Sequence, residues 1–227
     1  MKLTCAKYGL EINFRENIAE VLILENPVCM TEVITCIKAQ CEGNEGILIL
    51  SEKDNYLKFE KSVLAIVNPF SLNLNDRKIL SKLYNQMEAY GSDFGLEKEK
   101  INAQIISMMD QLILKSPYEN LTYQLEPGWI ELFKAYDLCF EKEKESLLEN
   151  LIEYIKVISN LTGIQLVCLI NIKSYFTNEE ILEFYKYVFY NKLHVLLIET
   201  VEREKLSNED VFIVDKDLCL IRKYASI

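Results

Sequence analysis

The sequence predicts an α/β fold in which a helical segment interrupts the chain. Apolar, strand-like runs separated by helical patterns occupy both ends of the 227 residues, as in "AEVLILE" near the start and "LVCLINI" near the end. Between these ends, apolar residues recur mainly at helical spacing. We therefore predict a discontinuous α/β head, residues 1–75 and 161–227, and an inserted helical leg, residues 76–160.

The first third of the chain is predicted to be rich in strands. "KLTCAKY" and "LEINF" predict a hairpin that turns at Gly9, and "AEVLILE" predicts a buried strand. A helix is expected from Pro27 to about Gln40, because proline is favoured in the first turn of a helix. Three further strands are expected in "GILILSE", "YLKFE" and "VLAIVNPF".

The middle of the chain is predicted to be helical. Apolar residues recur at helical spacing between Asp76 and Ser116, where Gly91 and Gly95 separate two predicted helices. Two prolines then interrupt the pattern in "KSPYENLTYQLEPGW". Two more helices are expected, in "WIELFKAY" and over residues 141–160.

The last part of the chain predicts a βαβ unit. Leu166–Asn171 and Val195–Glu199 are nearly all apolar, which is typical of buried parallel strands. Thr177 followed three residues later by Glu180 predicts a capping box at the start of the intervening helix. "VFIVDKDLCLIRK" predicts a closing hairpin that turns at residues 216–217.

Composition excludes several classes of protein. The net charge of −10 argues against binding to anionic membranes and against nucleic-acid binding over the whole surface. It does not exclude a local basic surface. No apolar run reaches the roughly 18–20 residues that span a bilayer, and charges interrupt "MKLTCAKYGLEINFREN", so we expect a cytoplasmic protein without a signal peptide. The seven cysteines contain no C-x-x-C pair, and His194 is the single histidine. Reduced thiols are therefore expected rather than a zinc site.

A βαβ unit of this kind also serves nucleoside-triphosphate hydrolases, but the phosphate-binding parts are missing. After "EVLILE" the chain reads "NPVCMTEV", which has neither the glycines nor the lysine of a phosphate loop, and Pro27 has no N–H group. Asn171 is a poor magnesium ligand, and Glu199 either lies at a ligand-binding edge or is a solvated strand end. No G-x-S-x-G motif accompanies His194. We expect no enzymatic activity.

Several segments, taken in order, resemble a known family: the small accessory protein of type II-A CRISPR loci that takes part in spacer acquisition. They are "EVLILENPVCMTEVITCI", "LKFEKSVLAIVNPFSLNLNDRKILSKLYNQME" and "LTGIQLVCLINIKSYFTNEEILEFYKYVFYNKLHVLLIE" with the "DVFIVDKDLCLIRK" that follows. The resemblance implies a P-loop-NTPase-like head without a phosphate loop and an inserted α-helical leg. It also implies a non-catalytic, ring-shaped homotetramer that threads the ends of double-stranded DNA and acts in antiviral defence. The implied partners are the two CRISPR integrase proteins and the RNA-guided type II nuclease.

A DNA-binding ring of such acidic chains requires basic residues gathered on its inner wall. The resemblance places a basic residue of the leg at Lys134. Four more lysines lie on the predicted inserted helices, where each could equally be an exposed member of an i,i+4 ion pair. These are Lys98, Lys100, Lys142 and Lys144.

The resemblance also implies calcium, which stabilises the ring in several relatives. Those relatives carry a dense acidic stretch where this chain has "KSPYENLTYQLEPGWIE", with only Glu119, Glu126 and Glu131 as carboxylates. Because calcium takes six to eight oxygen ligands, these three glutamates predict a weak site at best. No cofactor is expected to be required.

Two other functions are compatible with the sequence. A degenerate head could serve a nucleotide-binding regulator, which would bind ATP without hydrolysing it. Alternatively, the helical leg could dock a partner helix in a protein-only adaptor of the adaptation complex, which would form a dimer or ring without affinity for DNA.

Overall fold

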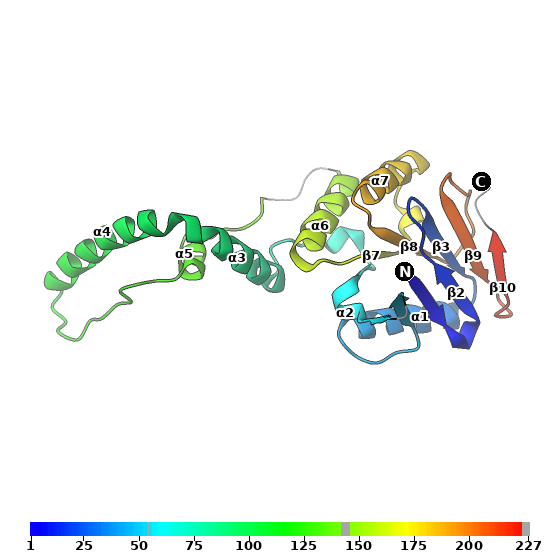
Figure 1. Cartoon of the computed structure of the whole chain (residues 1–227), viewed down its shortest axis with the longest axis horizontal. Helices are drawn as coiled ribbons and strands as arrows, with labels where there is room; N and C mark the ends of the chain where they lie inside the picture. Colours follow the sequence, from blue (N-terminus) through cyan, green and yellow to red (C-terminus); the bar gives the residue numbers. More distant parts are fainter. Residues whose placement is uncertain (54, 142–145, 224–227) are drawn as a thin grey trace. The chain divides into compact units, whose positions relative to one another are not determined.

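Figure 1 shows a computed structural model of the chain, which describes residues 1–53, 55–141 and 146–223. The chain divides into two compact units. Unit 1 consists of Met1–Asn73 and Glu143–Ile227, and unit 2 consists of Leu74–Lys142.

A six-stranded sheet forms the centre of unit 1. Its strands are β3 (Ala19–Leu24), β6 (Val63–Ile66), β7 (Leu166–Ile170), β8 (His194–Glu199), β9 (Glu209–Val214) and β10 (Leu220–Lys223). The order is β10-β9-β3-β8-β7-β6, and all neighbours are parallel except β10, which pairs antiparallel with β9. Every residue of β3, β7 and β9 is buried, as expected of strands covered on both faces.

Helices cover both faces of this sheet. On one face, the buried side chains of α1 (Pro27–Cys41) share a core cluster with Leu22 and Leu24 of β3. The alternate residues Val21 and Ile23 point to the opposite face, because successive side chains of a strand alternate. On that side lie α6 (Leu147–Thr162) and α7 (Asn178–Tyr190), as Figure 1 shows.

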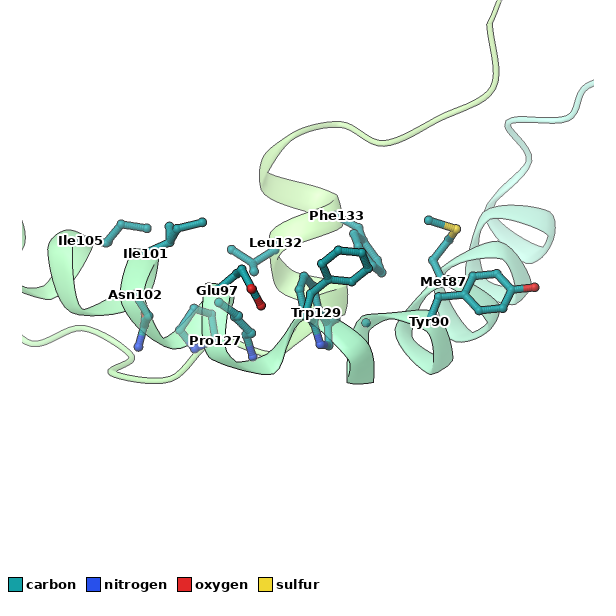
Figure 2. A pocket seen from close by; sticks show the side chains of 13 residues that line it. Met87, Tyr90, Glu97, Ile101, Asn102, Ile105, Pro127, Trp129, Leu132 and Phe133 are labelled. Atoms are coloured by element: carbon teal, nitrogen blue, oxygen red, sulfur yellow. The ribbon is translucent and has the colours of Figure 1, made fainter.

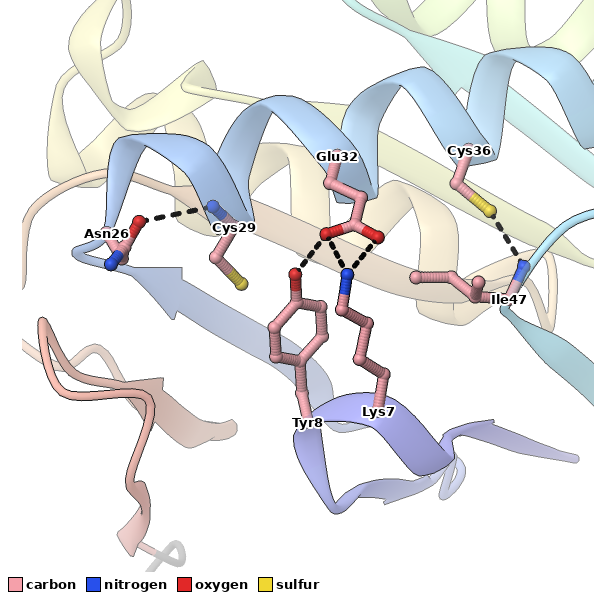
Figure 3. A network of polar contacts seen from close by, with 7 residues as sticks. All are labelled: Lys7, Tyr8, Asn26, Cys29, Glu32, Cys36 and Ile47. Carbon is pink, nitrogen blue, oxygen red and sulfur yellow. Dashed lines mark hydrogen bonds and ion pairs between the residues drawn. The ribbon is translucent and has the colours of Figure 1, made fainter.

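A second sheet, of four antiparallel strands in the order β2-β1-β4-β5, packs with α1 in the same core cluster. Its strands are β1 (Lys2–Cys5), β2 (Leu10–Asn13), β4 (Ile49–Glu52) and β5 (Asn55–Leu57). Between β1 and β2, the 3-10 helix η1 (Ala6–Tyr8) reaches Glu32 of α1 (Figure 3). The Tyr8 hydroxyl donates to the Glu32 carboxylate at 2.5 Å, and Lys7 Nζ lies 2.5 Å from the other oxygen. These contacts connect the first hairpin to the helix.

Most of the predicted elements of unit 1 are confirmed. The first hairpin turns at Gly9, whose φ of 58° is the left-handed conformation that favours glycine. In the predicted capping box, Glu180 N donates to Thr177 Oγ1 at 3.2 Å and Thr177 N donates to Glu180 Oε2 at 2.8 Å. All seven cysteines are free thiols.

One predicted strand is only partly correct. Within "YLKFE", the strand β5 ends at Leu57, and Phe59–Ser62 form the short helix α2. The chain has to leave the four-stranded sheet after β5 and enter the six-stranded sheet at β6. The helix makes this change of direction, and the Phe59 side chain is buried in the core beside α1.

The boundary of the insertion also differs from the predicted one. The sequence assigns residues 147–160 to the leg, whereas the structure places them in α6 of unit 1. The apolar stripe of this helix is the reason, because Leu151 and Ile155 are fully buried and the helix packs against α7. Its amphipathic pattern therefore covers the sheet of unit 1.

Unit 2 is a helical segment with an extended return. Its helices are α3 (Arg77–Gly91), the 3-10 helix η3 (Ser92–Phe94), α4 (Gly95–Leu114) and α5 (Trp129–Ala135). After α4, residues 115–128 return beside that helix, and α5 then packs against α3 (Figure 1). Asn102 Nδ2 donates to the Leu125 carbonyl at 2.7 Å, and the Tyr123 hydroxyl donates to Asp110 at 2.6 Å. These bonds hold the return segment to α4.

None of the helices in the parts of the chain that the structure describes combines the length and the hydropathy needed to cross a membrane.

Candidate nucleic-acid interface

The N-terminus of α1 follows the central strand β3, where a phosphate loop lies in many nucleotide-binding α/β proteins. Here the side chain of Asn26 accepts hydrogen bonds from Val28 N at 2.9 Å and Cys29 N at 3.3 Å (Figure 3). Pro27 has no N–H group to offer. Asn26 also donates through Nδ2 to the Lys216 carbonyl at 3.1 Å. The N–H groups that would hold a phosphate are thus bound by the protein itself.

The two strand ends that the sequence singled out make internal contacts. Glu199, at the end of β8, is only 2% exposed and accepts a hydrogen bond from Lys173 N at 3.0 Å. Burial raises the pKa of its carboxyl group. Asn171, which follows β7, accepts a hydrogen bond from Thr200 N at 3.2 Å. Both side chains join the end of β7 to the end of β8, so their contacts are structural.

Lys134 is exposed in the last turn of α5. Aromatic contacts hold this helix in place: the Trp129 and Phe133 rings stack with centroids 6.0 Å apart, and Phe133 lies 5.8 Å from Tyr84 of α3. Trp129 packs so closely on Gly91 that a Cβ atom there would lie 2.6 Å from its ring. The apolar side chains of α5 therefore pack against α3, and the lysine remains available to solvent.

Lys98 and Lys100 lie in the second turn of α4 and differ in their surroundings. Lys98 Nζ is 5.4 Å from the centroid of the Trp129 ring, and the residue is half-buried. It helps line a mainly apolar pocket of about 320 Å³, and Figure 2 shows the side chains that line this pocket. Lys100 is exposed and follows Glu99. The cation–π contact engages Lys98, whereas Lys100 is available to a ligand.

Lys142 and Lys144, the two remaining predicted DNA contacts, lie outside the residues that the structure describes. The three predicted calcium ligands are all exposed: Glu119 and Glu126 lie in the return segment, and Glu131 lies in the first turn of α5. Over residues 1–53, 55–141 and 146–223, no group of three or more acidic, cysteine or histidine side chains is arranged to hold a metal ion. Calcium binding stays a prediction.

Unit 2 leaves many large apolar side chains exposed. No residue of α4 is fully buried, although the helix is rich in isoleucine, leucine and methionine. Ile101, Met108 and Leu112 recur at helical spacing along one face, and each is more than half exposed. Leu114 is 84% exposed. Exposed apolar patches of this kind mark interaction surfaces in folded proteins.

A family model described as CRISPR-associated protein (Cas_Csn2) matches residues 40–218, which is most of the chain. The chain belongs to the Csn2 family. A protein from Enterococcus faecalis, named CRISPR-associated protein Csn2, is 23% identical to it over 186 residues, covering 80% of this chain and 81% of that protein. The family predicted from the sequence is therefore confirmed, and Csn2 membership gives the chain a role in a CRISPR system.

This Csn2-family chain also contains a buried acidic residue that the sequence did not single out. Glu20, at the start of the central strand β3, has no exposed surface, and neither of its carboxylate oxygens has a hydrogen-bond partner among the described residues. Burial, together with the negative charge of Asp210, raises the pKa of Glu20 to about 8. Asp210 itself forms an ion pair with Arg15. Glu20 is therefore expected to be protonated at neutral pH.

A second buried polar cluster lies on the α7 side of the sheet. Glu209 is fully buried, its carboxylate lies 2.6 Å from Lys173 Nζ, and it accepts a hydrogen bond from the Tyr185 hydroxyl at 2.6 Å. Burial and the neighbouring Glu209 charge raise the pKa of Tyr185 well above its usual value. From the sequence alone, an acid at a strand terminus looks solvated, so neither Glu20 nor Glu209 could be identified as buried.

Proposed function

We propose that the protein is a non-catalytic ring that binds the ends of double-stranded DNA without sequence preference and acts in CRISPR spacer acquisition, and so in antiviral defence. The observation that carries this proposal is the Csn2 family match over residues 40–218. The proposed partners are duplex DNA, further copies of the chain, the CRISPR integrase proteins and the RNA-guided type II nuclease.

The exposed apolar face of α4 supports self-assembly. Ile101, Met108 and Leu112 would each remove apolar area from water on association, at roughly 25 cal/mol per Å². A ring of four copies would cover this face in every copy, because a closed symmetric assembly leaves no unused interface. A closed homo-oligomer would thus bury the exposed face of unit 2, and the resemblance described above implies four copies.

The head is proposed to be a P-loop-NTPase-like domain that has lost nucleotide hydrolysis. In support, parallel strands surround β3, and the N-terminus of α1 is capped by Asn26 rather than open to a phosphate. Glu199 is buried and bound to Lys173 N, which makes it a poor candidate for a magnesium ligand. The scaffold would then serve assembly.

The ring would bind DNA through basic residues gathered locally, since the chain as a whole carries a charge of −10. Lys134 is exposed on α5 and is one such residue, with Lys100 as another. The proposal requires no metal for chemistry. Calcium at Glu119, Glu126 or Glu131 would bind weakly, and comparing the assembly in calcium and in a chelator tests its contribution.

DNA threading makes a topological prediction. Light scattering should give a mass near four times 26.5 kDa. In gel-shift competition, a linear duplex should bind, and a covalently closed circle of the same length should bind far more weakly, because a closed ring has to be loaded over an end. A monomer at micromolar concentration would contradict the ring. Equal binding of both DNA forms would mean that the contact is an open surface.

A further inference from the structure

The first turns of α3 form the most basic stretch of the chain. Residues 77–87 contain Arg77, Lys78 and Lys82 and no acidic residue. No other segment of eleven residues in the sequence combines three lysine or arginine side chains with no acidic one. In a chain of charge −10, this segment stands out as a place where an anion would be attracted.

Helix geometry separates these cations from the packed side of α3. Ile79 and Tyr84 are buried, and Tyr84 contacts Phe133 of α5. At 100° per residue, Lys78 and Lys82 project from the opposite side of the helix, about 6 Å apart along its axis. Asn85 continues the same face one turn later. All three are exposed, so this face of unit 2 is polar and basic.

The charges of this face are not neutralised locally. In the described part of the chain, none of Arg77, Lys78 and Lys82 forms an ion pair. The lysines of α4 differ, because Glu97 and Glu99 alternate with Lys98 and Lys100 and reduce the local potential. The electrostatic attraction of an anion to α3 should therefore be stronger than its attraction to α4.

The chemistry of this face fits phosphate groups better than a protein. Ser81 and Asn85 add neutral hydrogen-bond donors to the two lysines, and these are the side-chain types that contact phosphate oxygens. A protein-docking surface would carry an apolar centre and few lysines. The apolar side of α3 is instead the side that carries Ile79 and Tyr84. Nothing on the basic face selects a base, which suits binding without sequence preference.

We propose that the outward face of α3, formed by Lys78, Lys82 and Asn85 with Arg77 beside them, binds the phosphate backbone of duplex DNA. This inference rests on the DNA binding proposed above and names a surface for it. In each copy of the ring that contacts the DNA, the two lysines would replace about two condensed counterions and account for about 1.8 units of the salt dependence, at roughly 0.9 per phosphate contact.

The test compares two variants of the full-length chain by fluorescence anisotropy with a linear duplex across a salt series. Lys78→Gln/Lys82→Gln removes two charges from the α3 face. Lys115→Gln/Lys186→Gln removes two charges from exposed positions that are not assigned to DNA binding, one in unit 2 and one in unit 1, and is the matched control. The α3 variant should lower the slope of log affinity against log salt by at least about 1.8, the value for one contacting copy. Its loss of affinity relative to the wild type should then be at least roughly 60-fold larger at about 0.1 M salt than at about 1 M. The control should keep most of the wild-type slope. Thermal melting should be unchanged in both, because all four lysines are exposed.

The outcomes separate the two proposals. If the wild type binds DNA and the α3 variant keeps its slope, the α3 assignment is wrong while DNA binding stands. Equal losses in both variants would indicate a general charge effect and would also overturn the assignment. If the α3 variant loses self-association in light scattering and still binds DNA normally, the face binds an acidic surface of another copy instead. A wild type with no affinity for DNA would remove the proposed function itself.

Discussion

Glu20 should make the fold less stable as the pH rises. Its carboxyl group is fully buried in β3, and its oxygens lack hydrogen-bond partners within the described residues. Burial and the charge of Asp210 raise its pKa from 4.5 to about 8, and Arg15 opposes this only partly. The folded state therefore binds the Glu20 proton more tightly than the unfolded chain does. This contribution is fully present below pH 4.5 and is lost as the pH rises through about 8.

The magnitude follows from the size of the shift. Each pKa unit corresponds to about 1.4 kcal/mol, so the tighter binding of the Glu20 proton in the folded state contributes about 5 kcal/mol to the free energy of unfolding at low pH. About 3 kcal/mol of this contribution is lost between about pH 4.5 and neutral pH, and the rest is lost by about pH 8. Glu20→Gln keeps the shape of the side chain and cannot ionise. The free energy of unfolding of the variant should equal that of the wild type near pH 5 and exceed it by several kcal/mol above pH 8, to an order of magnitude.

Urea unfolding of both proteins at pH values between about 5 and about 9 measures this difference directly. Glu11→Gln is the control, because the exposed Glu11 carboxyl has its pKa lowered by Lys2 and should produce a difference of the opposite sign. The reasoning about Glu20 is refuted if the wild type and Glu20→Gln stay equally stable across the range. It is also refuted if the wild type gains stability over the variant with rising pH, since that would require an ionised Glu20 with a partner.

Two further substitutions test the packing of unit 2 and the cap of α1. Gly91→Ala should destabilise unit 2 by about 1–2 kcal/mol, because the new Cβ would lie 2.6 Å from the rigid Trp129 ring and overpacking outweighs the better helix propensity of alanine. The fluorescence of the single tryptophan during unfolding measures this loss of stability. Gly95→Ala is the control and should not destabilise unit 2, because no atom lies within 4 Å of the new Cβ. Equal stability of the two variants would contradict the close packing of Trp129 on Gly91. Asn26→Ala should cost about 1 kcal/mol through loss of the helix cap, whereas Asn26→Asp keeps the acceptor and should cost less, as circular-dichroism melting can measure. Neither the wild type nor an Asn26 variant should release phosphate from ATP with magnesium, and turnover that Glu199→Gln abolishes would contradict a non-catalytic head.

Local patterns were enough to predict most elements of unit 1. The capping box at Thr177, the turn at Gly9 and the apolar run of β8 each depend on a few neighbouring residues, so the sequence alone specifies them. The missing phosphate loop after β3 is also visible in the sequence, because it depends on residue types at adjacent positions. The structure adds that the Asn26 side chain caps the first turn of α1 by accepting hydrogen bonds from Val28 N and Cys29 N.

The candidate site was only partly predictable. The resemblance singled out Lys134, whereas Lys98 was one of four further lysines on the predicted inserted helices. The structure shows that Lys134 is exposed and that Lys98 contacts the Trp129 ring. The charge pattern of α3, with Arg77, Lys78 and Lys82 and no acidic residue over 77–87, is present in the sequence, but the sequence does not show which side of that helix is exposed. The packing of α3 against α5 decides which side of α3 is exposed, and this contact exists only in the folded chain.

The sequence by itself thus determined the α/β class, the positions of most strands and helices and the lack of phosphate-loop residues after β3, because these depend on residue types within short windows. It also indicated the family, through several segments taken in order along the chain. Only the tertiary structure decided that α6 covers the sheet of unit 1, that Glu20 and Glu209 are buried, and that unit 2 leaves an apolar face of α4 uncovered. Strand periodicity shows which face a side chain takes, but whether that face meets water or a helix depends on segments far apart in the chain. Burial raises the pKa of Glu20, so the sequence alone could not predict this shift.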